Sequence, residues 1–330
     1  MNVLTNEQRS AFDEDGFVVL RGLLDAKTDL DPVIIEYEGV LDRLARRLVE
    51  AREIASTHEE LPFGRRLSQI YLETRRVFAG HFDCTLSMAS VNADSPIWVG
   101  PAVFQLLRHE RILDVLEDLI GGEIYSNPVQ HVRIKPPEEY LPHVYKDERT
   151  GRIAGFGVGA TPWHQDNGVV LPLADETEMT TVWVAVTDAT VENGCLEVIR
   201  GSHRDGLLTH CASDGLGLSI PDPLLSLDRV VTCPMKCGDV LFMHRRTCHS
   251  SLPNRSQDVR ISYDLRYNPV GQPTGREIFP GFVARSRSNP ASELHDADDW
   301  AHLWLDTRKR LAGVALPVHH RWNSDDPVCA

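Results

Sequence analysis

Hydrophobic positions in the first third of the chain recur at helical spacing. Thr5 and Gln8 have the spacing of a capping box, so a first helix is predicted from here to Asp15-Gly16. The apolar run 17–20 then predicts a strand. Further helices are predicted over residues 31–55, 64–79 and 103–119, and two consecutive glycines end the last of them. We expect these helices to cover one face of a sheet.

After residue 123 the pattern changes to short strands. Residues 124–135 predict one long strand. In its last six residues, alternate side chains point to a basic face and to a mixed polar and apolar face. The basic face carries His131, Arg133 and Lys135, and the other carries Gln130, Val132 and Ile134. If the basic face lines the interior, Lys135 becomes a co-substrate contact, with His131 and Arg133 as candidate substrate contacts. Gln130, on the other face, is a further candidate substrate contact. The alternative is an exposed basic face, and the pattern favours neither.

Further strands are predicted over residues 180–186, 195–199, 229–233, 239–243 and 259–267, with turn signals such as Asn193-Gly194 between them. Residues 291–312 return to helical spacing. Trp183 lies on the first of these strands and is a candidate for the wall of a substrate pocket, although an aromatic residue there is more commonly ordinary core. Several short strands separated by turns indicate a β-sandwich or a β-barrel.

Residues 136–160 contain many prolines, glycines and charges and no predicted element. Loops of this length are more commonly functional than not, so we expect a lid or entrance loop. We expect a single domain over residues 1–330. It would comprise mostly helical support at 1–122, a β core at 123–270 that includes the loop, and a helical segment at 271–330.

Composition narrows the classes of function. The chain has 330 residues, of which 42% are hydrophobic and 25% charged, which is ordinary for a globular enzyme. Its net charge of −14 argues against nucleic-acid and membrane partners, and an anionic ligand would need specific cations. No apolar run approaches the ~20 residues of a membrane span. Seven cysteines without a C-x-x-C pair predict reduced thiols in a cytoplasmic protein. We expect a small-molecule substrate and a monomer or homodimer.

One histidine–carboxylate pair is distinctive in this context. With 14 histidines and 48 acidic residues, about two His-x-Asp/Glu pairs are expected by chance. There are four: His58/Glu60, His81/Asp83, His164/Asp166 and His203/Asp205. The first two fall in a region predicted to be helical, where i and i+2 side chains diverge, and the last falls in a turn-like loop. In an extended segment His164 and Asp166 share a face, and a distant His249 would complete a two-histidine, one-carboxylate iron site.

Three segments resemble one protein family. Residues 193–203 resemble the turn, strand and Gly-Ser-His loop of the phytanoyl-CoA dioxygenase family. Residues 238–260, which contain His249, Ser251 and Arg260, resemble that family's distal-histidine segment, and residues 4–20 resemble its N-terminus. The resemblance spans nearly the whole chain in the family's order. It implies a mainly β fold with flanking α-helices, a double-stranded β-helix (a cupin-like jelly roll), and an Fe(II)- and 2-oxoglutarate-dependent oxygenase.

The resemblance also assigns roles. His164, Asp166 and His249 become the catalytic metal ligands, Arg260 binds the far carboxylate of 2-oxoglutarate, and Ser251 donates a hydroxyl to that carboxylate. A buried carboxylate without a partner costs several kcal/mol, and the planar fork of an arginine is suited to bind it.

The implied reaction uses dioxygen to oxidise a substrate C–H bond and converts 2-oxoglutarate to succinate and carbon dioxide, with ascorbate as the reductant in assays. Relatives that halogenate replace the carboxylate ligand, which is present here, so hydroxylation is the expected outcome, with desaturation or ring formation also possible. The alternative is a metal-dependent hydrolase or isomerase on the same jelly roll that does not use 2-oxoglutarate. No concentrated basic tract is present for the phosphates of a CoA ester.

Overall fold

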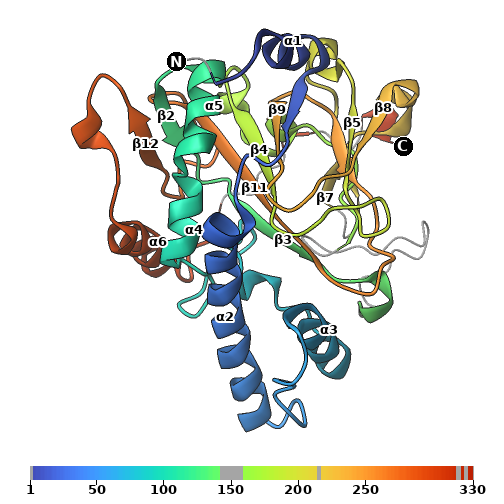
Figure 1. Ribbon diagram of the computed structural model, residues 1–330, viewed down its shortest axis with the longest axis vertical. Helices are drawn as coiled ribbons and strands as arrows, with labels where there is room; N and C mark the ends of the chain where they lie inside the picture. The colour runs from blue at the N-terminus through green and yellow to red at the C-terminus, as the bar shows by residue number, and fades with distance from the viewer. Residues whose placement is uncertain (1–2, 142–158, 214–216, 317–320, 323–325, 330) are drawn as a thin grey trace.

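The described residues form six α-helices and three antiparallel sheets: a major sheet, a minor sheet and the two-stranded β6–β7 hairpin (Figure 1). The computed structural model describes residues 3–141, 159–213, 217–316, 321–322 and 326–329. The predicted lid loop 136–160 therefore lies largely outside the described residues, with 138–140 forming a 3-10 turn. The α-helices are α1 Asn6–Asp15, α2 Asp31–Glu50, α3 Phe63–Thr74, α4 Pro101–Leu107, α5 Glu110–Ile120 and α6 Ala297–Leu311. The strands are β1 Phe17–Leu20, β2 Glu123–Ser126, β3 His131–Lys135, β4 Thr180–Ala185, β5 Leu196–Ile199, β6 Cys211–Ser213, β7 Gly217–Ser219, β8 Val230–Cys233, β9 Val240–His244, β10 His249–Ser251, β11 Arg260–Pro269 and β12 Phe282–Ser286.

The major sheet is organised around its longest strand, β11. Its order is β1-β9-β4-β11-β2-β12, and β3 pairs with β11 end to end with β2. The minor sheet has the order β10-β5-β8. The two sheets share a core to which the major sheet contributes Trp183, Leu241 and Met243, and the minor sheet Leu196 and Val198. Of the metal-ligand candidates, His249 lies on β10 of the minor sheet, and Asp166 contacts Arg266 on β11 of the major sheet.

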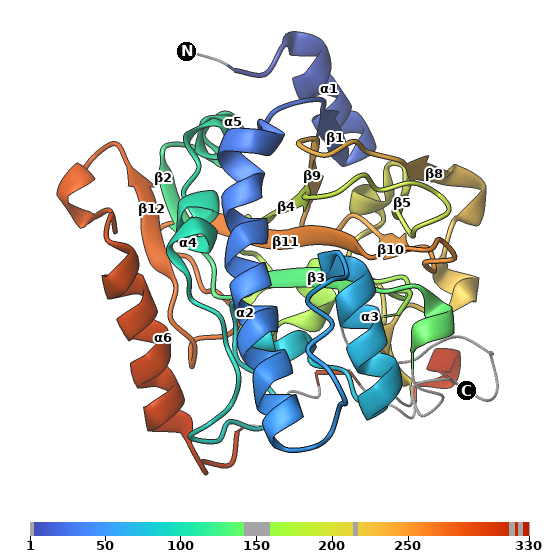
Figure 2. The same ribbon diagram turned by 60° about the horizontal axis from the view of Figure 1, so that its bottom comes forward.

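Period-2 alternation gives the major sheet two different faces. On β11 the outward positions Ile261, Tyr263, Leu265 and Tyr267 join the core formed with the helices. The long helix α2 crosses this face, with α4 and α5 beside it (Figure 2). The Tyr37 hydroxyl on α2 hydrogen-bonds the Tyr263 hydroxyl, and the Tyr267 hydroxyl donates to the Leu107 carbonyl at 2.7 Å. The predicted role of the N-terminal helices, covering one face of a sheet, agrees with this packing.

Two predicted elements are broken in the structure. The single strand predicted over residues 124–135 is wrong: β2 and β3 are separated by residues 127–130. Pro128 lacks an N–H for a ladder, and the Asn127 side chain accepts from the Val129 N–H at 2.9 Å in a local turn. The helix predicted over 103–119 is divided into α4 and α5, because Arg108 leaves the helical conformation at φ −115°. Buried leucines continue on both sides of this break, so hydrophobic spacing gives no sign of it.

Other boundaries differ less. The capping box of α1 is confirmed, with Thr5 and Gln8 bonded reciprocally and Gly16 in the left-handed conformation. The helix predicted over 64–79 ends at Thr74, because Arg75 is left-handed at φ 53°. His58 and Glu60 lie in a turn rather than in a helix, and the sequence interpretation of that pair was wrong.

The cysteines require a correction. Cys211 and Cys329 form a disulfide, whereas seven reduced thiols were predicted. The two cysteines lie 118 residues apart in sequence, and they meet where residues 326–329 contact the β6–β7 hairpin. A disulfide between such distant residues cannot be predicted from local cysteine spacing. The other five cysteines are free thiols. The cysteine count therefore no longer supports a reducing compartment. In the described part of the chain, none of the helices combines the length and apolarity needed to span a membrane.

Candidate metal centre

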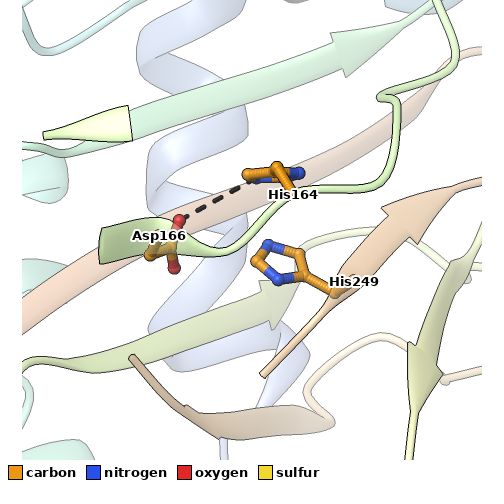
Figure 3. A group of neighbouring side chains, drawn as sticks. All are labelled: His164, Asp166 and His249. Atoms are coloured by element: carbon orange, nitrogen blue, oxygen red, sulfur yellow. Dashed lines mark ion pairs between the residues drawn. The ribbon is translucent and has the colours of Figure 1, made fainter. Parts of the chain in front are cut away.

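His164, Asp166 and His249 converge in space (Figure 3). One ligand atom from each lies within 4.8 Å of the other two, and all three residues are buried. Among the described residues this is the only group of His, Cys, Asp and Glu with such geometry. An isolated antiparallel bridge between His164 and His249 brings the two segments together, with N–H···O distances of 3.0 Å in both directions. Asp166 begins a 3-10 turn rather than continuing a strand, yet its carboxylate remains on the side of the two imidazoles.

Hydrogen bonds to the backbone fix the form of both imidazoles. Nδ1 of His164 lies 2.9 Å from the Pro162 carbonyl, and Nδ1 of His249 lies 3.0 Å from the Thr247 carbonyl. A carbonyl oxygen only accepts, so each Nδ1 carries the proton and each Nε2 presents its lone pair. Burial, and next the neighbouring His249, lower the pKa of His164 to about 3, so its imidazole is neutral at pH 7. Neutral imidazoles of this kind are metal ligands.

The carboxylate of Asp166 is held by Arg266 and Thr181. The Arg266 guanidinium donates to Oδ1 of Asp166 at 2.6 Å, and the Thr181 hydroxyl donates to Oδ2. Burial alone would raise the pKa of Asp166, but Arg266, His249 and His164 hold it well below its ordinary value. Arg266 also reaches Asp264 Oδ2 at 3.1 Å. The carboxylate is therefore ionised and oriented before any metal arrives.

Gln165, between the two ligands, turns away from them and fixes their segment in place. Its amide donates to the carbonyls of Gly206 and Arg246 at 2.8 and 2.7 Å, and its oxygen accepts from the Leu208 N–H at 2.8 Å. Its own N–H donates to Nε2 of His210 at 2.9 Å. Because Gln165 is fully buried, these bonds determine which way His164 and Asp166 project.

On the other side of the two histidines lies a cationic pocket, lined among others by Lys135, Trp183, Ser251 and Arg260. Arg260 is 2% exposed, donates to the Ser262 hydroxyl and to the Gly194 carbonyl (3.1 Å), and lies over the Trp183 ring at 5.2 Å. Its Nε is buried without a partner. Burial lowers the pKa of Arg260 to about 10 and holds that of Lys135 well below its ordinary value.

Comparison with known protein families assigns the chain to one of them. The family model "Phytanoyl-CoA dioxygenase (PhyH)" matches residues 12–262, about three quarters of the chain. The chain belongs to the phytanoyl-CoA dioxygenase family. As predicted, it is a dioxygenase, and its buried triad is the two-histidine, one-carboxylate ligand set of a mononuclear iron site.

Individual relatives of this family member are distant. Phytanoyl-CoA dioxygenase 1 of Oryza sativa subsp. japonica is 27% identical over 273 residues, which cover 79% of this chain and 88% of that protein. A phytanoyl-CoA dioxygenase of Arabidopsis thaliana is 34% identical over 113 residues, 34% of this chain and only 39% of that protein. Among solved structures, the apo form of the non-haem monooxygenase ThoJ has a TM-score of 0.56 at 19% identity, covering 91% of this chain and 95% of that one. This likeness confirms the predicted jelly-roll fold.

The other sequence candidates are distributed over two places. Arg133, Lys135 and Trp183 line the pocket beside the histidines, so the basic face of β3 does point inward. His131 lies away from that pocket, paired with Asp83 at 2.9 Å. Gln130 precedes β3, and its amide bonds the backbone N–H and carbonyl of Arg266, both at 3.0 Å. Gln130 therefore holds β11 in place. The sequence alone does not indicate this role, because it shows only a polar residue next to a strand.

Asp264 and Arg266 are the site residues that the sequence interpretation of this dioxygenase missed. They follow Arg260 at intervals of four and six along β11, so alternation puts all three on one face. Pairing with β3 on one side and β4 on the other makes β11 an interior strand of the sheet, and all three side chains are buried. The signal was available in the strand pattern, but charges on a strand ordinarily indicate a solvated face.

Proposed function

We propose that the protein is an Fe(II)- and 2-oxoglutarate-dependent dioxygenase that hydroxylates a small-molecule substrate. His164, Asp166 and His249 would hold the iron, and Arg260, Ser251 and Lys135 would bind 2-oxoglutarate. When bound, iron and 2-oxoglutarate supply dioxygen activation and the oxidation of a substrate C–H bond, with release of succinate and carbon dioxide.

The observation that carries the proposal is the state of two buried cations. Arg260 and Lys135 both lie in the pocket beside the histidines, and in the described part of the chain neither has a carboxylate within ion-pair distance. Among the described residues, the Lys135 ammonium donates to the Ser251 hydroxyl (2.7 Å) and the Leu252 carbonyl (2.6 Å) alone. Asp264 also lines this pocket, but it pairs with Arg266 and Arg133. Two buried charges without a paired anion are costly, and a dicarboxylate bound there would neutralise them.

Ser251 adds a directed donor to this pocket. Its oxygen accepts from Lys135 and, at 2.8 Å, from the Thr161 N–H. A hydroxyl has two lone pairs and one proton, so both acceptor positions are used and the proton remains available. That proton suits a carboxylate oxygen of the co-substrate. Lys135 would then act mainly by orienting the hydroxyl and adding positive charge.

The remaining residues prepare the metal for this chemistry. Arg266 and Thr181 keep the Asp166 carboxylate ionised and oriented, and the backbone carbonyls keep each Nε2 aimed at the metal. Because the carboxylate ligand is present, hydroxylation is proposed over halogenation.

Succinate formation tests the proposal. The full-length protein with Fe(II), ascorbate and 2-oxoglutarate should form succinate, and calorimetry under anaerobic conditions should show one 2-oxoglutarate site that requires metal. If the metal binds and 2-oxoglutarate does not, the proposal fails and a metal-dependent hydrolase or isomerase takes its place.

A further inference from the structure

A second cavity lies next to the metal pocket. It is formed between the segment 79–96 and strand β3, and its volume is about 500 Å³. That size is typical of sites for small organic ligands. Arg133 lines both this cavity and the pocket with the two histidines, so the two spaces adjoin at this residue. A molecule bound here would lie beside the metal centre rather than at a remote surface.

The cavity lining is mostly apolar, and it includes the guanidinium of Arg276, which has no described partner. Leu86, Met88 and Val132 contribute to the apolar part, and Arg276 adds a guanidinium. No hydrogen bond or ion pair of that guanidinium is formed with any described residue, and burial lowers the pKa of Arg276 to about 10. Repulsion by Arg266 and Arg133 acts in the same direction.

The Asp83 carboxylate also lines this cavity, but it is hydrogen-bonded to strand β3 rather than to Arg276. Asp83 Oδ2 lies 2.9 Å from Nδ1 of His131, and Oδ1 accepts from the Val132 N–H at 3.1 Å. These bonds tie Asp83 to β3 and leave Arg276 as a cation facing an apolar space. A ligand with one anionic group and an apolar body matches both features.

We propose that this cavity binds the organic substrate, and that the substrate is a small apolar carboxylic acid whose carboxylate pairs with Arg276. This inference rests on the proposed function. The apolar body would lie against Leu86, Met88 and Val132, next to the metal pocket. A CoA thioester fits less well: it carries several phosphate charges, whereas Arg133 and Arg276 are the cavity's only arginines or lysines among the described lining residues.

Binding measurements test this without requiring turnover. The full-length protein is titrated, by ligand-observed NMR and calorimetry, with monocarboxylic acids of six to fourteen carbons, both linear and cyclic, and with the methyl ester of each. The acids should bind more tightly than their esters. Arg276→Gln should weaken acid binding about ten- to a hundredfold and leave ester binding unchanged. Arg276→Lys should restore part of the affinity, since an ammonium keeps the charge without the planar fork.

Two controls locate the effect. Arg255→Gln removes a cation from an exposed position and should leave acid binding unchanged. The 2-oxoglutarate dissociation constant should not change in Arg276→Gln, so failure of 2-oxoglutarate to bind the wild type would refute the proposed function without touching this result. Equal binding of acids and esters, retained acid preference in Arg276→Gln, or displacement of the acids by 2-oxoglutarate would each overturn the inference. If Arg276→Gln does not fold, undiminished acid affinity in Arg276→Lys overturns it instead.

Discussion

Replacing Arg260 with methionine distinguishes between two roles for this residue, binding 2-oxoglutarate and stabilising the fold. Methionine fills much of the same volume and removes the charge. If the function of Arg260 is to bind 2-oxoglutarate, its buried charge lowers the stability of the protein when the co-substrate is absent. The substitution should then remove binding with little loss of stability. A structural arginine would behave in the opposite way.

The magnitudes follow from the surroundings of Arg260. Burial lowers its pKa from the ordinary 12.5 to about 10, and at ~1.4 kcal/mol per pKa unit the charge costs about 3 kcal/mol in the ligand-free protein. Arg260 is only 2% exposed, so solvent screens little of this. Against that stand its bonds to Ser262 and Gly194, about 1 kcal/mol each, and its contact with the Trp183 ring, of similar size. The two sides nearly cancel, so Arg260→Met should change ligand-free stability by less than about 1 kcal/mol.

Co-substrate binding should respond much more strongly. At 2-oxoglutarate concentrations a hundred times the wild-type dissociation constant, binding stabilises the wild type by ~2.7 kcal/mol. A hundredfold weaker affinity in Arg260→Met reduces this to ~0.4 kcal/mol at the same concentration. Denaturant melts with Fe(II) under anaerobic conditions, with and without 2-oxoglutarate, measure both quantities.

Arg285→Met is the matched control. Arg285 is also buried, but it pairs with Asp114 at 2.7 Å and Glu117 at 3.0 Å. Its removal should destabilise the protein by ~1–3 kcal/mol and leave the 2-oxoglutarate effect intact. The reasoning is refuted if Arg260→Met loses several kcal/mol without ligands and keeps the wild-type stabilisation by 2-oxoglutarate.

Three further substitutions and one control test the metal centre and the co-substrate pocket. Asp166→Ala should weaken Fe(II) binding and abolish turnover while the protein still melts cooperatively, whereas His203→Ala should leave Fe(II) binding and turnover unchanged. An active Asp166→Ala enzyme would remove this carboxylate from the site. Arg266→Leu should weaken Fe(II) binding about ten- to a hundredfold by releasing the Asp166 carboxylate, which a metal titration measures, and an unchanged affinity would contradict the orienting role. Ser251→Ala should raise the 2-oxoglutarate dissociation constant roughly two- to tenfold by calorimetry, and no change would mean that the hydroxyl serves only Lys135 and Thr161.

Local signals predicted the fold class and the first helix well. The capping box at Thr5 and the β-branched strand at residues 180–186 depend on neighbours in sequence, and both appear close to the predicted bounds. The separation of β2 from β3 could also have been predicted, since Pro128 lies inside the predicted strand and cannot donate to a ladder. The pairing of Cys211 with Cys329 could not, because it depends on where the end of the chain packs.

The candidate site was partly predictable for the same physical reason. The spacing of His164, Asp166 and His249 identified the triad, and the structure brings these residues together. Whether a charged strand face is solvated or enclosed depends on what lies on either side of it. For Asp264 and Arg266 the side-chain partners include Arg133 and Asp166, which come from segments about 100 residues or more earlier in the chain.

Strand β11 joins stability and chemistry in one element. Its inward side chains at alternate positions are Arg260, Ser262, Asp264 and Arg266, and its outward ones are Ile261, Tyr263, Leu265 and Tyr267. A slip of one residue against β4 would exchange the two sets and bury four polar side chains against the helices. The hydrophobic packing of α2, α4 and α5 on the outer face therefore sets the register that aims the polar residues at the metal pocket. Because the contacts of Arg260 on the inner face do little more than offset the cost of its burial, the apolar outer face must supply most of the stability of this strand.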